Sequence, residues 1–139
     1  MDTSGWVCLA DADQPFHQET TNVYQRARAQ RRRLVTTNYI IAEIVALLGS
    51  RTRIPRQDLI AFIEGLKTTP DIDIIHISEA QDVEAWALLK ARLDKDWSLV
   101  DASSFVVMPM LGIVEALTTG HHFLQAGFVR LPMQPAQPS

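Results

Sequence analysis

The sequence is poor in cysteine and contains no long apolar run. Its one cysteine, Cys8, excludes a disulfide within the chain and a paired-cysteine zinc motif. Such cysteine usage is typical of a reducing compartment. No apolar stretch approaches the roughly 20 residues that a membrane-spanning helix needs. The first residues lack the basic-then-apolar layout of a signal peptide. These absences predict a cytoplasmic protein without a membrane partner.

The chain also has little net charge, −3 at pH 7, which alone gives no reason to expect a nucleic-acid partner. The arginines, however, gather in two short stretches, which are Arg26, Arg28, Arg31, Arg32 and Arg33, and then Arg51, Arg53 and Arg56. Basic clusters contact RNA phosphates in many proteins. The alternative for the first stretch is that it complements and solvates a helix C-terminus. The sequence slightly favours this second interpretation.

Length and composition predict one globular domain. The 139 residues are 47% hydrophobic and 21% charged, which is ordinary for a chain that buries one core. Near the end, prolines alternate with polar residues. We therefore expect a domain over residues 1–132 and a flexible proline-rich tail over 133–139.

Apolar periodicity and capping signals predict helices and strands in alternation. Helices are expected over 16–33, 38–49, 56–67, 78–93 and 100–110, and a compact turn or helix over 121–125. The clearest strand contains the four isoleucines of residues 72–77, and shorter strands are expected at 34–36, 116–119 and 128–131. This order predicts a parallel α/β sheet covered by helices, with functional groups outside the carboxyl ends of its strands.

The helix that begins at Ser78 carries the strongest start signal, because Gln81 follows at the capping-box spacing. Its apolar residues are predicted to form one buried stripe, made of Val83, Trp86, Ala87, Leu89 and Leu93. Trp86 and Trp97 are therefore interpreted as packing groups, and Cys8 as a small core residue. The apolar faces of the 38–49 and 56–67 helices are either ordinary core or a groove for a partner.

Three acidic residues lie in apolar surroundings near predicted element ends. Asp2 precedes the first helical segment, Glu43 lies inside the 38–49 helix, and Asp101 lies in the first turn of a later helix. A carboxylate among apolar residues is costly to bury without a partner. One divalent cation would explain all three, and oxygen ligands favour Mg²⁺ or Mn²⁺ over zinc. Taken singly, Asp101 could only complement a helix dipole and Asp2 could only be a cap.

These acids and their surroundings resemble the PIN-domain family, in particular the VapC-like toxin nucleases of bacterial and archaeal toxin–antitoxin pairs. Four segments carry the resemblance in the same order and separation. They are DTSGWVCLAD at 2–11, TTNYIIAEIVALL at 36–48, WSLVDASSF at 97–105 and ALTTGHHFLQAGF at 116–128. The resemblance therefore spans nearly the whole chain, from Asp2 to about Pro132.

The resemblance implies a PIN-like three-layer α/β/α sandwich with a five-stranded parallel sheet. It implies that Asp2, Glu43 and Asp101 hold Mg²⁺ or Mn²⁺ and hydrolyse RNA. Ser4 and Ser98 match supporting hydroxyl positions, and Asp96 is an outer-shell acid candidate. The implied function is that of a metal-dependent endoribonuclease toxin, with an RNA substrate, a cognate antitoxin and a homodimeric assembly.

The sequence departs from the family pattern in two places. Gly120 stands where the family has a fourth acid, and Asp96, His121 and His122 are the candidates to compensate. Only Met1 precedes Asp2, so the first strand is expected to be truncated unless the native start lies upstream. Gly120 supports an alternative function, a catalytically impaired module that binds RNA or protein.

Two further interpretations carry less weight. Adjacent histidines on a helix do not face one metal together, so His121 and His122 are interpreted as structural or solvent-facing. An unrelated α/β enzyme acting on a small phosphorylated molecule is a third functional class. The chain has no glycine-rich phosphate loop to support that interpretation.

Overall fold

The computed structural model describes residues 1–11, 13–51, 54–118 and 121–131. Gly120 and the predicted tail at 133–139 lie outside these ranges. The elements follow one another as α1 (Thr3–Ala10), α2 (His17–Ala29), β1 (Leu34–Thr37), α3 (Asn38–Arg51), α4 (Arg56–Thr68), β2 (Ile72–Ile75), α5 (Glu79–Ala91), α6 (Leu99–Met110), β3 (Glu115–Leu117), α7 (His122–Gln125) and β4 (Val129–Leu131). None of the described helices is long and apolar enough to cross a membrane.

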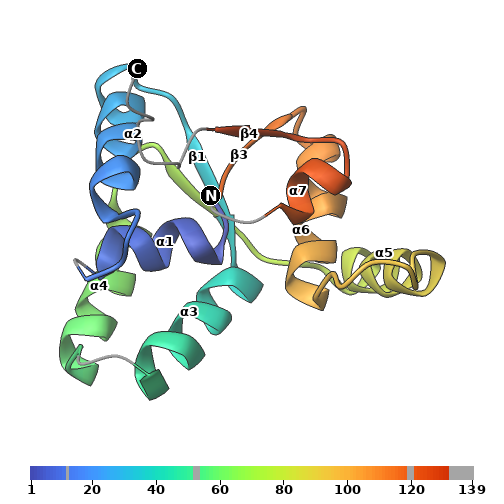
Figure 1. Ribbon diagram of the computed structural model, residues 1–139, viewed down its shortest axis with the longest axis horizontal. Coiled ribbons are helices and arrows are strands. Elements are labelled where there is room, and N and C mark those ends of the chain that lie inside the picture. The colour runs from blue at the N-terminus through green and yellow to red at the C-terminus, as the bar shows by residue number, and fades with distance from the viewer. Residues whose placement is uncertain (12, 52–53, 119–120, 132–139) are drawn as a thin grey trace.

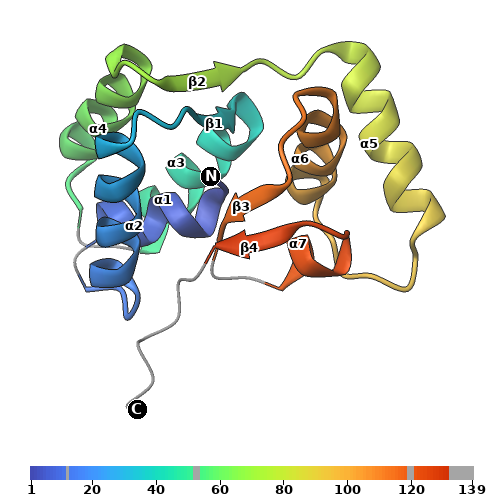
Figure 2. The same ribbon diagram turned by 90° about the horizontal axis from the view of Figure 1, so that it is seen from above.

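The strands form two parallel pairs, β1 with β2 and β3 with β4. Figure 2 shows the order β2, β1, N-terminus, β3, β4 across the molecule, with helices on both sides. The amino group of Met1 donates a hydrogen bond to the carbonyl oxygen of Val35 (2.6 Å). The amide of Asp2 donates a hydrogen bond to the carbonyl oxygen of Leu117 (3.4 Å). The start of the chain therefore links the two strand pairs.

A cavity of about 320 Å³ lies between β1 and β3, and we call it the central slot. Figure 1 shows β1 and β3 converging at their carboxyl ends, beside the N-terminus, and diverging toward their amino ends. Apolar side chains from both strands and from α6 line the slot, among them Leu34, Val107, Ala116 and Leu117. At its outer end Arg32 forms an ion pair with Glu115, with Nη2 and Oε2 2.6 Å apart. The slot therefore separates the outer parts of β1 and β3.

The main core forms where α1 packs against α3 and α4. Trp6 has no solvent exposure, and its ring meets those of Tyr24 and Phe62 edge to face. Aliphatic residues of α3 and α4 surround it: Ile40, Ile44, Leu48, Leu59, Ile63 and Leu66. The apolar faces of the two helices are thus largely core. Gly5 permits α1 to lie close to β3, because a Cβ at residue 5 would lie 2.8 Å from the carbonyl oxygen of Leu117.

Trp6 also makes a buried polar contact that links α1 to β1. Its Nε1 donates to Oγ1 of Thr36, 3.1 Å away, and Thr36 is 1% exposed. Thr36→Val keeps the shape but leaves the indole N–H unpaired, so we expect a loss of roughly 1–3 kcal/mol in the free energy of unfolding. Urea denaturation measures this. The double variant with Trp6→Phe should cost less than the sum of the single changes, because no unpaired donor remains. A strictly additive result would contradict the assigned contact.

The predicted buried stripe on the helix from Ser78 holds at Leu89, which packs against the core around Phe105, and is wrong at its other residues. Ala85 is fully buried, whereas Trp86 is 47% exposed and Val83 is 62% exposed. Leu93 lies beyond the end of α5 and is 87% exposed. The reason is that α5 lies at the edge of the molecule and packs mainly on α6 (Figure 1). Trp97, by contrast, is buried against Phe105 as predicted.

Most predicted elements are present, with shifted ends. The capping box of Ser78 and Gln81 is confirmed, and Thr37 caps α3 through a bond from the amide of Ile40 to its Oγ1 (3.1 Å). The predicted stop at Gly49 is wrong, because α3 continues to Arg51. Residues Thr3–Ala10, for which the sequence predicts no element, form the helix α1.

Candidate active site

The side chains that the resemblance singles out line one cavity of about 490 Å³. The structure places there Asp2, Ser4, Glu43, Asp96, Ser98 and Asp101, together with His122. They come from the start of α1, from α3, from the segment before α6, from the first turn of α6 and from α7. The fold thus brings the distant acids to a shared cavity. Figure 1 shows that α1 and α3 begin beside the carboxyl ends of β1 and β3. The catalytic roles of the acids stay a prediction.

Asp2 is held by three hydrogen bonds. Oδ1 accepts from the hydroxyl of Ser4 (2.7 Å) and from the amide of Gly5 (3.1 Å), and Oδ2 accepts from the hydroxyl of Thr118 (2.7 Å). Asp2 therefore caps α1, in line with one interpretation of the sequence, and also faces the cavity. Burial raises the pKa of the Asp2 carboxyl, while the bonds from Thr118 and Ser4 lower it.

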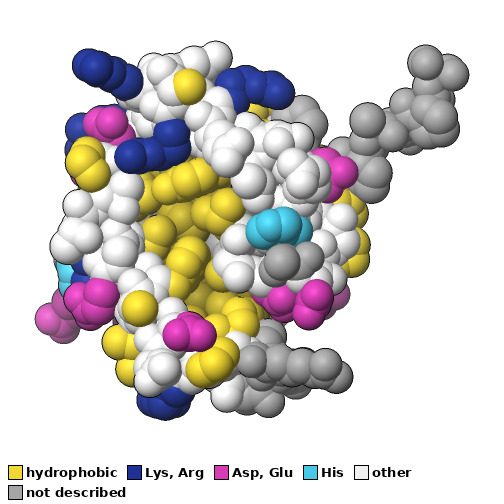
Figure 3. All heavy atoms as spheres, turned by 90° about the vertical axis from the view of Figure 1, so that its left-hand side faces the viewer, with side chains coloured by type: hydrophobic (Ala, Val, Ile, Leu, Met, Phe, Trp, Pro, Cys, Tyr) yellow, Lys and Arg dark blue, Asp and Glu magenta, His cyan; other side chains and the backbone are white. Residues whose placement is uncertain are grey.

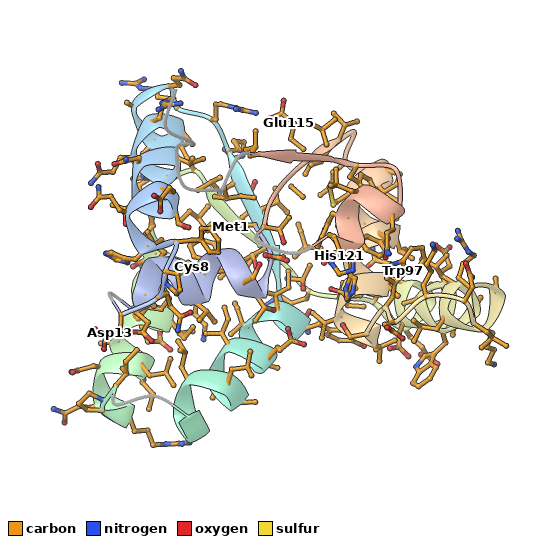
Figure 4. All side chains as sticks on the ribbon, viewed as in Figure 1. Met1, Cys8, Asp13, Trp97, Glu115 and His121 are labelled. Atoms are coloured by element: carbon orange, nitrogen blue, oxygen red, sulfur yellow. The ribbon has the colours of Figure 1, made fainter. Side chains whose placement is uncertain are left out.

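Asp101 lies in a capping box with Ser98. The amide of Ser98 donates to Oδ2 of Asp101, and the amide of Asp101 donates to Oγ of Ser98, both at 3.0 Å. The predicted support by Ser98 therefore has a defined geometry. Nδ1 of His122 lies 2.9 Å from the same Oδ2. His122 is thus turned toward an acid of the cavity, whereas His121 is exposed at the start of α7 (Figure 4).

The remaining acids are less closely held. Glu43 is partly exposed on α3, and Asp96 is exposed before α6. Within residues 1–11, 13–51, 54–118 and 121–131, no three His, Cys, Asp or Glu side chains are close enough to form a metal cluster. The acids share a cavity without lying at direct ligand distances from one common point.

The structure accounts for much of the first arginine stretch by contacts within the protein. Arg28 donates to the carbonyl oxygen of Pro70, Arg32 pairs with Glu115, and Arg33 pairs with Asp73. These contacts favour the structural interpretation of the stretch.

Figure 3 shows a hollow of apolar side chains on the face that carries α2 and α4, with Lys or Arg side chains at its upper end. Cys8 is buried on α1 (Figure 4), as predicted for a core residue.

Sequence reasoning missed Thr118, and it named His122 only as a candidate to compensate for the fourth acid, without predicting its contact with Asp101. Thr118 is fully buried and bonds to an acid 116 residues earlier in the chain. The signal that could have found them is the TTGHHF segment at 118–123, which carries the resemblance and is rich in hydroxyl and imidazole groups. The groups of this segment that contact Asp2 and Asp101 are thus a hydroxyl and an imidazole, and not a carboxylate.

Two parallel strand pairs flanked by helices, with carboxylates gathered in one cavity, define a PIN-like α/β/α sandwich. Comparison with known proteins bears out this fold. The crystal structure of VapC20 from Mycobacterium tuberculosis, described as a sarcin–ricin loop cleaving toxin, superposes with a TM-score of 0.79 at 27% identity, over 92% of this chain and 94% of that chain.

The sequence comparison points to the same protein. The 23S rRNA-specific endonuclease VapC20 of Mycobacterium tuberculosis, strains H37Rv and CDC 1551, is 28% identical over 131 residues, which are 94% of this chain and 95% of the relative. No family model matches the chain. The resemblance to VapC-like PIN-domain toxins, first carried by four short segments, thus holds over nearly the full length.

Proposed function

We propose that this chain is a metal-dependent endoribonuclease and the toxin of a toxin–antitoxin pair. The observation that carries the proposal is the convergence of Asp2, Glu43 and Asp101 on one cavity. These are the acids that the resemblance assigns to catalysis, and the curated relative that matches nearly the whole chain is a 23S rRNA endonuclease. The nuclease class explains both the acidic cavity and the similarity.

The donor set of the cavity fits a hard divalent cation. The available groups are carboxylates and hydroxyls, which Mg²⁺ and Mn²⁺ prefer. Mg²⁺ usually keeps several of its waters. It can therefore be bound by acids that lie farther from one common point than direct ligands would. We propose Asp2, Glu43 and Asp101 as the holding residues. A bound ion there would supply charge for the scissile phosphate and lower the pKa of a water.

The chain's own residues prepare the two most enclosed acids. Ser4 and Thr118 donate to Asp2, so its oxygens are fixed, and these bonds offset part of the rise in its pKa that burial causes. Ser98 fixes Asp101 at the first turn of α6. Asp96 is exposed, and the side chains of Asp96 and Glu43 would complete the set of acids around a bound phosphate or ion.

The test is cleavage of RNA by the purified chain. A hairpin that contains the sarcin–ricin loop of 23S rRNA is the first substrate, because the VapC20 relative is named for that target. We expect Mn²⁺ or Mg²⁺ to support cleavage and a chelator to abolish it. A hairpin with an altered loop is the substrate control. Cleavage that persists unchanged in excess chelator would reject the metal-dependent mechanism.

The partners are proposed on the similarity alone. A VapC-like toxin implies a cognate antitoxin, and we propose a homodimer as the toxin's own assembly. The mass in solution by light scattering tests the dimer. A cytoplasmic location is also proposed, because ribosomal RNA would be met there.

The second candidate is a PIN-like module with impaired catalysis. The lack of a three-residue metal cluster among the described residues favours it, and so does Gly120 in the sequence. On this alternative, Gly120→Asp should raise Mn²⁺-dependent cleavage roughly tenfold or more, since lost groups at metal sites cost about that much. Gly49→Asp, an exposed change on α3, is the matched control. If the wild-type chain already cleaves efficiently and Gly120→Asp changes little, the impaired module is excluded.

A further inference from the structure

The segment around α7 holds both enclosed acids of the cavity by side-chain donors. Thr118 donates to Oδ2 of Asp2, and His122 contacts Oδ2 of Asp101. The two acids are far apart in the sequence, and the two donors are four residues apart. This is the segment in which the family resemblance leads one to expect an acid. In this chain the segment contributes Thr118 and His122, which contact the acids at the starts of α1 and α6.

Asp101 has its hydrogen bonds concentrated on one oxygen. Oδ2 accepts from the amide of Ser98 at 3.0 Å and from Nδ1 of His122 at 2.9 Å. A carboxylate oxygen only accepts, so Nδ1 of His122 carries the hydrogen of this bond. No donor to Oδ1 is found among the described residues that surround it. The carboxylate is thus fixed by Oδ2, and Oδ1 is the oxygen available to the cavity.

We propose that His122 is a positioning residue that orients Asp101 for a metal ion. The proposal rests on the proposed metal-dependent function. Ser98 alone fixes one point of the carboxylate, and rotation about the Cβ–Cγ bond would remain. The imidazole adds a second donor from another element, and both partners are mostly enclosed, with side chains 29% and 20% exposed. Bonds to a charged acceptor are about twice as strong as neutral ones, so this one restrains the rotation.

The direct test is Mn²⁺ binding measured by titration calorimetry, without RNA. In His122→Leu the donor is lost, and we expect Mn²⁺ affinity to fall roughly 10- to 100-fold, as for other groups that orient a metal ligand. In His122→Asn the side-chain amide can donate from nearly the same place, so affinity should stay within a few-fold of wild type. His121→Leu removes the exposed neighbouring imidazole and should leave affinity unchanged.

A metal-free measurement tests the contact itself. The ¹⁵N and ¹H signals of Nδ1 in His122 should show a protonated, hydrogen-bonded nitrogen in the wild-type chain, and Asp101→Asn should shift them. Thermal unfolding of each variant shows that the fold is intact. An exchange-broadened Nδ1 signal that is indifferent to Asp101→Asn would overturn the assigned bond.

The binding outcomes are decisive. Wild-type affinity in His122→Leu, or an equal loss in His122→Asn and His122→Leu, would overturn the positioning role. A wild-type chain that binds no Mn²⁺ would overturn it as well. If the wild-type chain binds Mn²⁺ and His122→Leu weakens that binding, but no RNA is cleaved, the proposed function fails and the positioning role stands.

Discussion

Asp101→Asn is expected to lower metal-dependent RNA cleavage by at least roughly 100-fold, the upper range for groups that support a catalytic metal. The asparagine keeps the size of the side chain but not its charge. Its one amide oxygen would be drawn to the amide of Ser98 and to Nδ1 of His122, which both donate to this position. The –NH₂ group would then face the cavity, where a cation needs an acceptor.

The measurement is the initial rate of cleavage of the sarcin–ricin hairpin at saturating Mn²⁺. Asp58→Asn, which removes the same charge from the exposed first turn of α4, is the control and should cleave like wild type. Thermal unfolding should show a modest loss for Asp101→Asn, about 1 kcal/mol, because a helix cap is weakened. An Asp101→Asn variant that is folded and cleaves at the wild-type rate would end the proposal that this acid is catalytic.

Local signals in the sequence predict most of the elements. The capping box of Ser78 and Gln81 and the isoleucines of β2 are recognised from neighbouring residues, and the structure has both. The same capping-box spacing is present at Ser98 and Asp101, and the structure has that capping box as well. A residue that caps a helix can also face a cavity, so the interpretations of Asp101 as a cap and as a metal ligand do not exclude each other.

Contacts between distant elements are not predictable in the same way. The stripe on α5 has helical spacing, but spacing does not say which neighbour covers it, and Trp86 is left half exposed. Likewise, nothing near Asp2 in the sequence indicates that Thr118 will bond to it. The costly burial of three carboxylates in apolar surroundings suggests that Asp2, Glu43 and Asp101 share a cation, and the family resemblance, which reaches across the chain, adds that they share a cavity, as the structure has it.

The central slot leads to a prediction about stability. Four apolar residues, Leu-Val-Val-Ile, joined before Met1 should enter the slot and pair with β1 and β3, because Met1 and Asp2 already bond to Val35 and Leu117 at its inner end. Burial of two or three of these side chains gives roughly 1.5–3 kcal/mol each, offset by ordering of about 1–2 kcal/mol per residue. Main-chain pairing adds about 1 kcal/mol per bond. A net gain of about 3 kcal/mol would raise the melting temperature by roughly 10 °C.

The control extension is Ser-Gly-Ser-Gly, which has the same length but no apolar side chains and little strand preference. Scanning calorimetry compares the two extended chains with the chain expressed from Met1. Hydrogen exchange of the β1 and β3 amides should slow only with the apolar extension, since only there do the strands gain a neighbour. Equal melting temperatures for the two extensions would show that the slot does not accept a strand.

The pH dependence of stability gives an independent check on the same site. In the chain expressed from Met1, burial lowers the pKa of the amino group from 8.0 to about 6. Between these values the unfolded chain binds a proton that the folded chain does not, so the free energy of unfolding rises as the pH rises from 6 to 8. The apolar extension turns this amine into an amide, and Asp2 is unchanged. In the extended chain this rise, which is about 2–3 kcal/mol at most, should therefore be absent. Urea denaturation at pH 6 and pH 8 measures it, and an equal rise in both chains would mean that the amino group is not buried in the slot.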